Sequence, residues 1–456
     1  MNADGAAYRA AIAALEARGR FGIRLGLGRT RALLRELGDP QLAFRGALVA
    51  GTNGKGSVIA LAGSALRSAG FRVGETPKPH LVSYRERLVI NGRPVDPDTF
   101  GRLVSEVLPV ADRVARRYGE PTEFELLTAI IFRWFAESNV EVALVEVGLG
   151  GRLDATHVWD GGVAVVTNVT LDHMDRLGTT IPLIAREKAA IIERGDLAVT
   201  GTSGDALAVV RRRARRLGVP LREVDPAPVL ASGREGIDVE LPRLGTTRVG
   251  LLGRHQAANV AVADALLDAL AEAGIADVSD AARRQGYETA RWPGRLELLQ
   301  VNGRDVLLDG AHNPAGATAL AAALDDLRPV LSGGDVNQPA PLTLVVASMQ
   351  DKDVGGVVAA LAGSVALRGA RVIATGVHNA RALPAAQLAA EWRSALPGAR
   401  VEIIEDPGAA LDAALDPGQG SRAGPVVVAG SLYLVGDARR RLVDDPDLRD
   451  PEVLPA

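Results

Sequence analysis

A glycine-rich loop carries the residue types that hold phosphate groups. It consists of Gly51, Thr52, Asn53, Gly54, Lys55, Gly56 and Ser57. Glycines let backbone N–H groups approach phosphate oxygens, the lysine reaches the outer phosphates of a nucleotide, and the serine hydroxyl reaches Mg²⁺. The apolar run 47–50 predicts a buried strand before the loop, and apolar residues on one face of 57–69 predict a helix after it. Because a helix N-terminus carries partial positive charge, this arrangement predicts a nucleotide site.

The spacing of the loop departs from the common G-x-x-x-x-G-K-[ST] pattern. Two residues separate Gly51 from Gly54, and Gly56 stands between Lys55 and Ser57. A glycine-rich turn that binds nothing is the alternative interpretation. The presence of Asn, Lys and Ser in one short turn argues against that alternative.

Lysine is rare in this chain. Four of its 52 Lys and Arg residues are lysines, namely Lys55, Lys78, Lys188 and Lys352. Unlike arginine, lysine has an amine that can lose its proton and react. Lys188 lies in a predicted helix, 181–192, in which Pro182 is typical of a helix start. A solvated helix charge is the alternative for Lys188, and chance retention at the surface is the alternative for Lys78 and Lys352.

Three candidate metal ligands follow predicted strands or belong to the loop. Glu146 ends the predicted strand 141–147, His173 follows the predicted strand 163–167, and Ser57 belongs to the loop. Ligands collect beyond the carboxyl ends of strands in open α/β sheets. Oxygen ligands with one imidazole suit Mg²⁺ or Mn²⁺ bound to nucleotide phosphates. A carboxylate that caps the next turn and a polar loop histidine are the alternatives.

Composition limits the classes of protein to which the chain can belong. Its 456 residues are 47% hydrophobic, its net charge is −3, and it has no cysteine. The charge gives no electrostatic case for binding nucleic acid or anionic membranes. No apolar run approaches the ~18–20 residues that cross a bilayer. We expect a cytoplasmic monomer of two or three domains without disulfides or thiolate metal sites.

Strands and helices alternate along the chain, which predicts two doubly wound α/β domains. The first, 1–294, is of the phosphate-loop ATPase type, and the second, 295–456, is smaller and Rossmann-like. The hinge is predicted at Pro293-Gly294. Predicted helices in the first domain include 124–136 and 256–273. Predicted strands in the second domain are 305–308, 342–347, 371–375, 401–404 and 426–429. We expect 201–250 to be irregular apart from short strands such as 236–241, and 331–341 to be a surface loop.

Further short motifs follow the loop in a fixed order. They are 79–81 (Pro-His-Leu), 86–87 (Glu-Arg), 146–156, 172–173, 187–189, 293–295, 309–314 and 430–436. Together with the loop they resemble the folylpolyglutamate synthase/dihydrofolate synthase family of the Mur ligase superfamily. Other Mur ligases usually have Thr or Ser directly after the loop lysine, where this chain has Gly56.

The resemblance implies an ATP-dependent amide ligase with ATP and Mg²⁺ as cofactors. Its small-molecule substrates would be L-glutamate and either dihydropteroate or a reduced folate. The γ-phosphate passes to a substrate carboxylate, and the amine of glutamate then attacks the acyl phosphate. The phosphate loop and Mg²⁺ would neutralise the charge on the transferring group. A Mur-type ligase for peptidoglycan precursors and an inactive nucleotide-binding relative are the alternatives; a dinucleotide oxidoreductase would need a G-x-G-x-x-G loop, which is absent.

The resemblance also assigns roles to particular residues. The pterin pocket would be lined by Thr122, Glu123, Phe124, Asp154 and Ala155. ATP would be held across the hinge by Asn259, Arg295 and Asp309, and the incoming glutamate would lie near His312 and Ser431. Lys188 would be carbamylated and would hold a second Mg²⁺ with His173. Lys55, Lys188 and His173 would be the catalytic residues, and Ser57, Glu146, His173 and Lys188 the metal ligands.

One residue departs from the family pattern. The family usually has a metal-binding Ser before Pro-His-Leu, and this chain has Lys78. An ammonium has no lone pair and cannot ligate a metal ion. Either Thr76 or water completes the metal shell, or Lys78 itself contacts phosphate.

Overall fold

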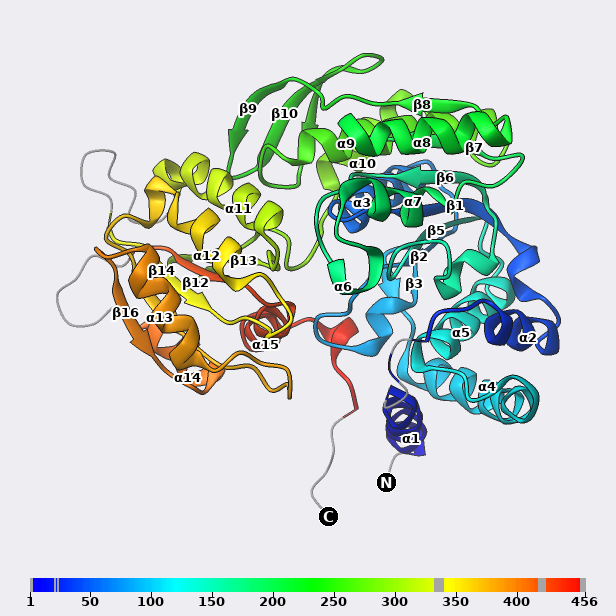
Figure 1. The fold of residues 1–456 in the computed structure, drawn as a ribbon, viewed down its shortest axis with the longest axis horizontal. Helices are drawn as coiled ribbons and strands as arrows, with labels where there is room; N and C mark the ends of the chain where they lie inside the picture. The colour runs from blue at the N-terminus through cyan, green and yellow to red at the C-terminus, as the bar shows by residue number, and fades with distance from the viewer. Residues whose placement is uncertain (1–2, 20–21, 23, 332–339, 417–423, 452–456) are drawn as a thin grey trace. The chain divides into compact units, whose positions relative to one another are not determined.

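The structure is a computed structural model that describes residues 3–19, 22, 24–331, 340–416 and 424–451. Contacts divide the chain into two compact units, which Figure 1 shows as a ribbon. Unit 1 is Met1–Pro226, Ala258–Tyr287 and Asp445–Ala456, and unit 2 is Ala227–Ala257 and Glu288–Asp444. The domain boundary at 294/295 stays a prediction about independent folding.

Unit 1 is built on an eight-stranded sheet of order β4-β3-β2-β5-β1-β6-β7-β8. The strands are β1 (Arg45–Ala50), β2 (Val73–Thr76), β3 (Val89–Ile90), β4 (Arg93–Pro94), β5 (Val142–Glu146), β6 (Gly162–Val166), β7 (Leu197–Thr200) and β8 (Leu221–Glu223). All neighbours pair in parallel except β2 with β3 and β3 with β4. Because β1 and β5 are adjacent and parallel, their carboxyl ends bring residues 51 and 146 to one edge of the sheet, and both strands are buried along nearly their whole length.

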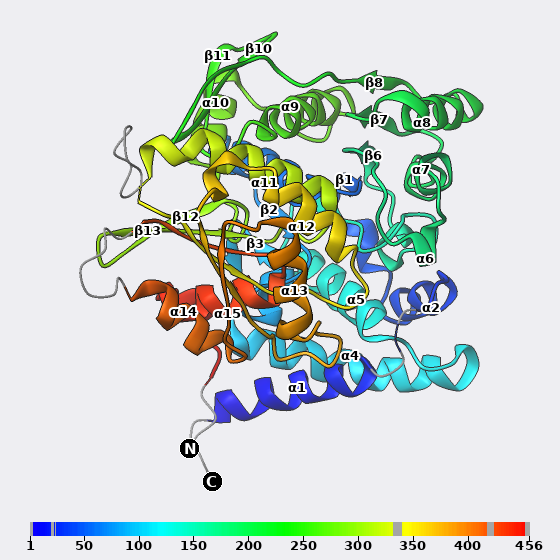
Figure 2. The same cartoon turned by 60° about the vertical axis from the view of Figure 1, so that its left-hand side comes forward.

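Helices surround this sheet. They are α1 (Ala3–Gly19), α2 (Gly28–Glu36), α3 (Lys55–Ser68), α4 (Pro97–Tyr118), α5 (Glu123–Glu137), α6 (Met174–Leu177), α7 (Ile181–Ala189), α8 (Gly204–Leu217), α9 (Gln256–Glu272) and α10 (Asp280–Thr289). One core joins Phe132 of α5 to Leu48 and Val145 of the sheet. Figure 2 shows α1 lying beside α4, which it contacts. The helix α3 packs against β1, β2 and β5, which fixes the helix start at the loop.

Unit 2 contains two sheets. The six-stranded sheet has the order β12-β13-β17-β14-β15-β16, and the three-stranded sheet has the order β11-β10-β9. The strands are β9 (Val229–Gly233), β10 (Gly236–Leu241), β11 (Gly245–Val249), β12 (Glu297–Val301), β13 (Arg304–Asp309), β14 (Thr343–Val346), β15 (Arg371–Ala374), β16 (Arg400–Ile403) and β17 (Val426–Ala429). The helices are α11 (Pro314–Leu327), α12 (Val354–Ala362), α13 (Ala385–Ala395), α14 (Pro407–Leu415) and α15 (Leu432–Leu442).

Short 3-10 helices complete the described structure of both units. They are Pro40–Ala43, Tyr84–Arg87, Ala155–Val158, Arg328–Val330, Val365–Leu367 and Pro446–Leu448. Within the described ranges, no helix combines the length and the hydropathy that crossing a membrane requires.

The α/β class with two sheet-based domains is confirmed, and the predicted strands of the second domain form β13 to β17. The predicted short strand 236–241 is β10, one of the four short strands β8 to β11 in this region, whereas the expectation of irregular structure is wrong for 204–217, which form α8. Buried Ala206, Val210 and Ala214 lie four residues apart along α8, so one face packs while the arginine-rich face meets solvent. Most of the predicted loop 331–341 lies outside the described residues.

Candidate active site

The phosphate loop connects β1 to α3 and requires glycine at two positions. The backbone φ of Gly54 is 82°, in the left-handed region, at the N-cap of α3. A Cβ on Gly54 would lie 2.3 Å from Asn259 Oδ1, and a Cβ on Gly51 would lie 1.9 Å from Thr167 Oγ1. The loop backbone therefore approaches its neighbours more closely than any side chain allows.

The end of β6 holds the loop in shape. The backbone N–H of Thr52 donates to Asn168 O at 2.9 Å, and that of Asn53 donates to Asn168 Oδ1 at 2.8 Å. The hydroxyl of Thr167 donates to Asn53 O at 2.7 Å. We did not predict these positioning roles; the place of 167–168 at a strand end was the available signal.

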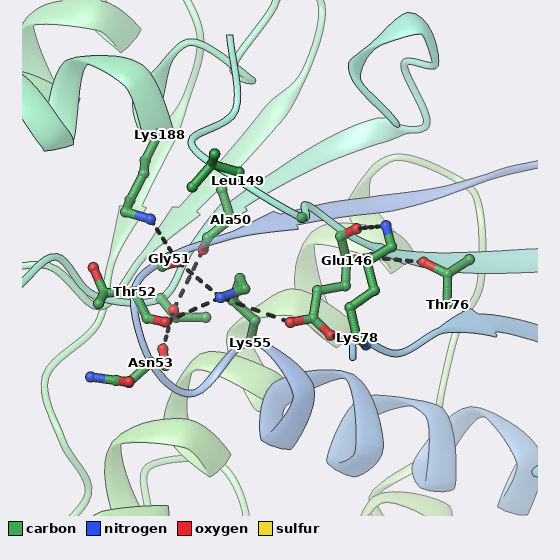
Figure 3. Close-up of polar contacts among 12 residues, drawn as sticks. Ala50, Gly51, Thr52, Asn53, Lys55, Thr76, Lys78, Glu146, Leu149 and Lys188 are labelled. Carbon is green, nitrogen blue, oxygen red and sulfur yellow. Dashed lines mark hydrogen bonds and ion pairs between the residues drawn. The ribbon is translucent and has the colours of Figure 1, made fainter. Parts of the chain in front are cut away.

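Lys55 begins α3 and its side chain turns back over the loop. Its ammonium donates to Gly51 O and to Thr52 O, both at 3.1 Å, and lies 3.8 Å from Glu146 Oε1 (Figure 3). The loop lysine and the carboxylate at the end of β5 are thus neighbours, as the sequence predicts for a phosphate site.

Lys188 of α7 contacts the same loop, although it lies 137 residues after Gly51 in the chain. It is 5% exposed, and its ammonium donates to Gly51 O at 2.8 Å (Figure 3). Burial and then the charge of Lys55 lower the pKa of Lys188 to about 7, against the opposing charges of Asp172 and Asp154. An amine with this pKa is neutral in a large fraction of molecules at neutral pH.

Lys78 and Thr76 bracket Glu146, the predicted metal ligand. The backbone N–H of Lys78 donates to Glu146 Oε2 at 2.9 Å, and its ammonium donates to Glu146 O. The backbone N–H of Glu146 donates to Thr76 Oγ1 at 3.0 Å. Burial lowers the pKa of Lys78 to about 8, although the charges of Asp154 and Glu146 oppose this shift. Glu146 therefore contacts two lysine residues, Lys55 and Lys78 (Figure 3).

Two of the residues expected to line the acceptor pocket, Phe124 and Asp154, lie near Lys78. Its ammonium is 4.7 Å from the ring centroid of Phe124, in the first turn of α5. Asp154 Oδ2 accepts from the backbone N–H groups of Gly148 and Leu149 at 3.0 and 2.9 Å. The buried Thr122 caps α5 through a reciprocal pair of hydrogen bonds with Glu125. Glu123 and Ala155 begin α5 and the following 3-10 helix, respectively.

The other predicted metal ligands differ in exposure. Ser57 is buried in the first turn of α3. His173 caps α6 with a φ of 49°, its side chain is 43% exposed, and its Nε2 lies 4.0 Å from Asp172 Oδ1. Among the residues that the structure describes, no three His, Asp or Glu side chains form a metal-binding group. A Mg²⁺ ion that bridges phosphates needs only one or two protein carboxylates.

The donor set fits Mg²⁺ in one place and not in another. Asp172, whose charge acts on Lys188, offers carboxylate oxygens, and His173 beside Asp172 offers an imidazole nitrogen. A carbamate on Lys188 would add oxygens. Beside Glu146, Lys78 offers only N–H donors.

Several of the residues predicted to contact ATP or glutamate belong to unit 2. Asp309 ends β13 and accepts from the backbone N–H groups of Leu296 and Ala311, both at 2.9 Å. Burial raises the pKa of Asp309, while the nearby Arg295 lowers it. Ser431 caps α15. His312 Nδ1 lies 2.7 Å from Gly310 O. Asn259 lies in unit 1, on α9 beside Gly54.

Two known families match the chain, and they cover both units. The Mur ligase middle domain matches residues 49–267, and the glutamate ligase domain of Mur ligases matches residues 294–432. The chain is 35% identical to the dihydrofolate synthase/folylpolyglutamate synthase of Bacillus subtilis (strain 168), over 96% of this chain and 99% of the relative. It is 34% identical to the protein of that name from Mycobacterium tuberculosis, over 92% and 90%.

Solved structures of similar proteins have the same fold. Mycobacterium tuberculosis folylpolyglutamate synthase complexed with ADP and AMPPCP matches with a TM-score of 0.83 and 32% identity, over 96% of this chain and 100% of the other. E. coli FolC in complex with DHPP and ADP matches with a TM-score of 0.79 and 28% identity, over 94% and 98%.

Proposed function

We propose that this chain, which belongs to the dihydrofolate synthase/folylpolyglutamate synthase family of Mur ligases, uses ATP to join L-glutamate to dihydropteroate, to a reduced folate, or to both. The observation that carries this proposal is the glycine loop, whose Lys55 lies 3.8 Å from Glu146 beside Phe124 and Asp154. Relatives with these names act on this class of substrates.

The reaction needs charge neutralisation and exclusion of water. The acceptor carboxylate takes the γ-phosphoryl group of ATP and ADP leaves, which gives an acyl phosphate. The amine of glutamate attacks the acyl carbon, loses a proton, and releases phosphate as the amide forms. The loop N–H groups and the Lys55 ammonium stabilise the negative charge on the transferring phosphoryl group. Mg²⁺, when bound, would add positive charge at the same oxygens.

We assign the remaining residues from the resemblance and the local chemistry. Phe124 offers an aromatic face for a pterin ring, and the fixed Asp154 orients the 148–149 turn beside it. Asn259 contributes to the ATP site from α9. Arg295 and Asp309 are proposed ATP contacts, and His312 and Ser431 are proposed glutamate contacts. The cytoplasmic location and the monomeric state also remain predictions.

We further propose that Lys188 is carbamylated. The Lys188 ammonium first loses a proton, and the neutral amine then attacks CO₂ and loses a second proton, so the side chain changes from +1 to −1. Its position on Gly51 O, which Lys55 also contacts, favours this loss of positive charge. The new carboxylate would hold Mg²⁺ together with His173, since hard cations prefer oxygen ligands.

Lys188→Arg tests the carbamate, because arginine keeps the charge and cannot react with CO₂. We expect this variant to be as inactive as Lys188→Ala, and we expect acetate to restore part of the activity of Lys188→Ala. Lys352→Arg is the matched control. A ¹³C resonance from labelled bicarbonate should appear in the wild type and be absent from both Lys188 variants. Full activity of Lys188→Arg would contradict the proposal.

The acceptor is identified by ADP release. Dihydropteroate and tetrahydrofolate are each supplied with ATP and glutamate, and a UDP-linked peptidoglycan precursor serves as the comparison. We expect ADP release with dihydropteroate, with tetrahydrofolate, or with both. We expect this release to continue over many turnovers only when glutamate is present. Release with the peptidoglycan precursor alone would overturn the assignment.

A further inference from the structure

Lys78 contacts Glu146, the carboxylate at the end of β5 that the sequence predicts as a metal ligand. Lys78 is half-buried, and its backbone and ammonium both contact Glu146. Thr76, two residues earlier, accepts the backbone N–H of the same Glu146 at 3.0 Å. The segment 76–78 therefore fixes Glu146 through three hydrogen bonds, two of which come from Lys78.

The charges around Glu146 are already balanced by protein groups. Two carboxylates, Glu146 and Asp154, attract the Lys78 ammonium, and Lys55 approaches Glu146 Oε1 at 3.8 Å. Asp154 is held by the backbone N–H groups of Gly148 and Leu149 and by Thr156. Two ammonium groups thus face two carboxylates in a buried site, where interactions between charges are stronger than in water.

A divalent cation bound to Glu146 would meet unfavourable neighbours. One carboxylate oxygen of Glu146 already accepts the Lys78 N–H at 2.9 Å, and the other faces Lys55. The Lys78 ammonium contains donors and no lone pair, so it can repel a cation and cannot ligate it. Phe124, 4.7 Å below the ammonium, holds that charge by a cation–π contact.

We propose that Lys78 is a resident cation that replaces a divalent metal ion at Glu146. The ammonium neutralises the negative charge of the phosphoryl group and of the acceptor carboxylate where they meet. The nucleotide complex of this chain consequently holds one divalent ion fewer than that of a variant with serine at position 78. The inference rests on the proposed nucleotide site and refines its metal content.

The test counts metal ions bound with a nucleotide analogue and uses no acceptor substrate. Mn²⁺ stands in for Mg²⁺, AMPPCP stands in for ATP, and bound Mn²⁺ is measured by electron paramagnetic resonance on the full chain. We expect Lys78→Ser to bind one more Mn²⁺ per chain than the wild type. Lys78→Arg keeps the positive charge and should give the wild-type number, as should the control Lys352→Ser.

A second measurement tests the proposal if Lys78→Ser fails to fold. Lys78→Met keeps the length of the side chain and removes its charge. In EDTA, the wild type should bind AMPPCP with a Kd within about tenfold of its value with Mn²⁺. The affinity of Lys78→Met for AMPPCP should fall at least about a hundredfold in EDTA, because roughly one charge contact in the site is missing. Equal Mn²⁺ numbers in the wild type and Lys78→Ser, or equal EDTA sensitivity of the wild type and Lys78→Met, would overturn the proposal.

The Mn²⁺ count and the ligase assay test different proposals, so either proposal can fail while the other holds. A wild type that binds AMPPCP and Mn²⁺ as expected but releases no ADP with any folate-type acceptor would refute the proposed reaction and leave the resident cation standing. A wild type that turns over and binds as many Mn²⁺ ions as Lys78→Ser would do the reverse.

Discussion

One carbonyl oxygen, that of Gly51, accepts hydrogen bonds from two lysine side chains. Lys55 donates at 3.1 Å and Lys188 donates at 2.8 Å. Two like charges ~4 Å apart repel by about 4 kcal/mol at an effective dielectric constant of ~20. Since Lys55 is placed to meet phosphate, Lys188 is the amine that gains by losing its charge, and its pKa is lowered to about 7.

Lys55→Ala should abolish most ATP-dependent turnover. The loss of one positioned cation or donor at a developing charge commonly costs ~10²–10³ in rate. Steady-state ADP release, with acceptor and glutamate saturating, measures the effect. Lys352→Ala, which removes a lysine of unit 2, serves as the control. Near-normal turnover of Lys55→Ala would remove the basis for a phosphate loop at this position.

Asp196, at the end of the turn before β7, should make stability depend on pH. Its side chain is buried, and burial followed by the neighbouring Asp160 raises its pKa to about 8. The folded chain therefore keeps a proton that the unfolded chain loses above pH ~4. The stability that this proton contributes is complete below pH ~4 and is lost as pH rises to about 8.

Asp196→Asn removes the titrating group and keeps a group that can accept from Glu193 N. We expect its Tm to exceed that of the wild type at pH 9 by roughly a few degrees and to match it near pH 5. Thermal unfolding at both pH values measures this, with the exposed Asp205→Asn as control. An equal difference in Tm at both pH values would show that Asp196 is ionised in the fold.

At the scale of elements, α10 and α3 meet through backbone. A Cβ on Gly286 of α10 would lie 2.3 Å from Ala65 Cα and 2.4 Å from Ala65 N. Since α3 begins at Lys55, this contact helps to position the phosphate loop. Glycine inside a helix is normally unfavourable by about 1 kcal/mol relative to alanine, and here close packing outweighs that cost.

Gly286→Ala should therefore destabilise the chain although it improves helix propensity. Overpacking of a close contact costs typically ~1–3 kcal/mol. Urea unfolding of unit 1 and the Kd for AMPPCP should both worsen. Gly28→Ala, in α2, meets nothing within 4 Å and should be neutral or stabilising. If Gly286→Ala were also stabilising, the two helices would have room to separate.

Local sequence patterns predicted the helices and strands better than the contacts between distant parts of the chain. The loop, α3 and β5 could be predicted because hydrophobic periodicity and glycine spacing are local properties. The contact of Lys188 with Gly51 spans 137 residues, and only its residue type gave a hint. The helix α8 was missed because its arginine-rich face obscured three buried residues, and β12 was missed because its residues alternate in burial only weakly.

At the scale of the whole molecule, the chain passes between the two units more than once. Residues Ala227–Ala257 belong to unit 2 although they precede the predicted hinge at 293–294. The sequence could not reveal this, because β9 to β11 pair with one another, and the contact of β9 in unit 2 is with α11, later in the chain. Arg234, after β9, pairs with Asp305 of β13 at 2.5 Å, and Arg254 pairs with Asp326 of α11 at 2.5 Å.

A fragment of residues 288–444 should consequently fold only when 227–257 accompanies it. Asp305 is 1% exposed, and a buried carboxylate without its partner costs roughly 3–5 kcal/mol. We expect a fusion of 227–257 to 288–444 through a Gly/Ser linker to unfold cooperatively on heating. The same fusion with Arg234→Ala should melt at a lower temperature, and Arg243→Ala, outside this pair, should have little effect. Cooperative unfolding of 295–456 by itself would instead support a domain boundary at 294/295.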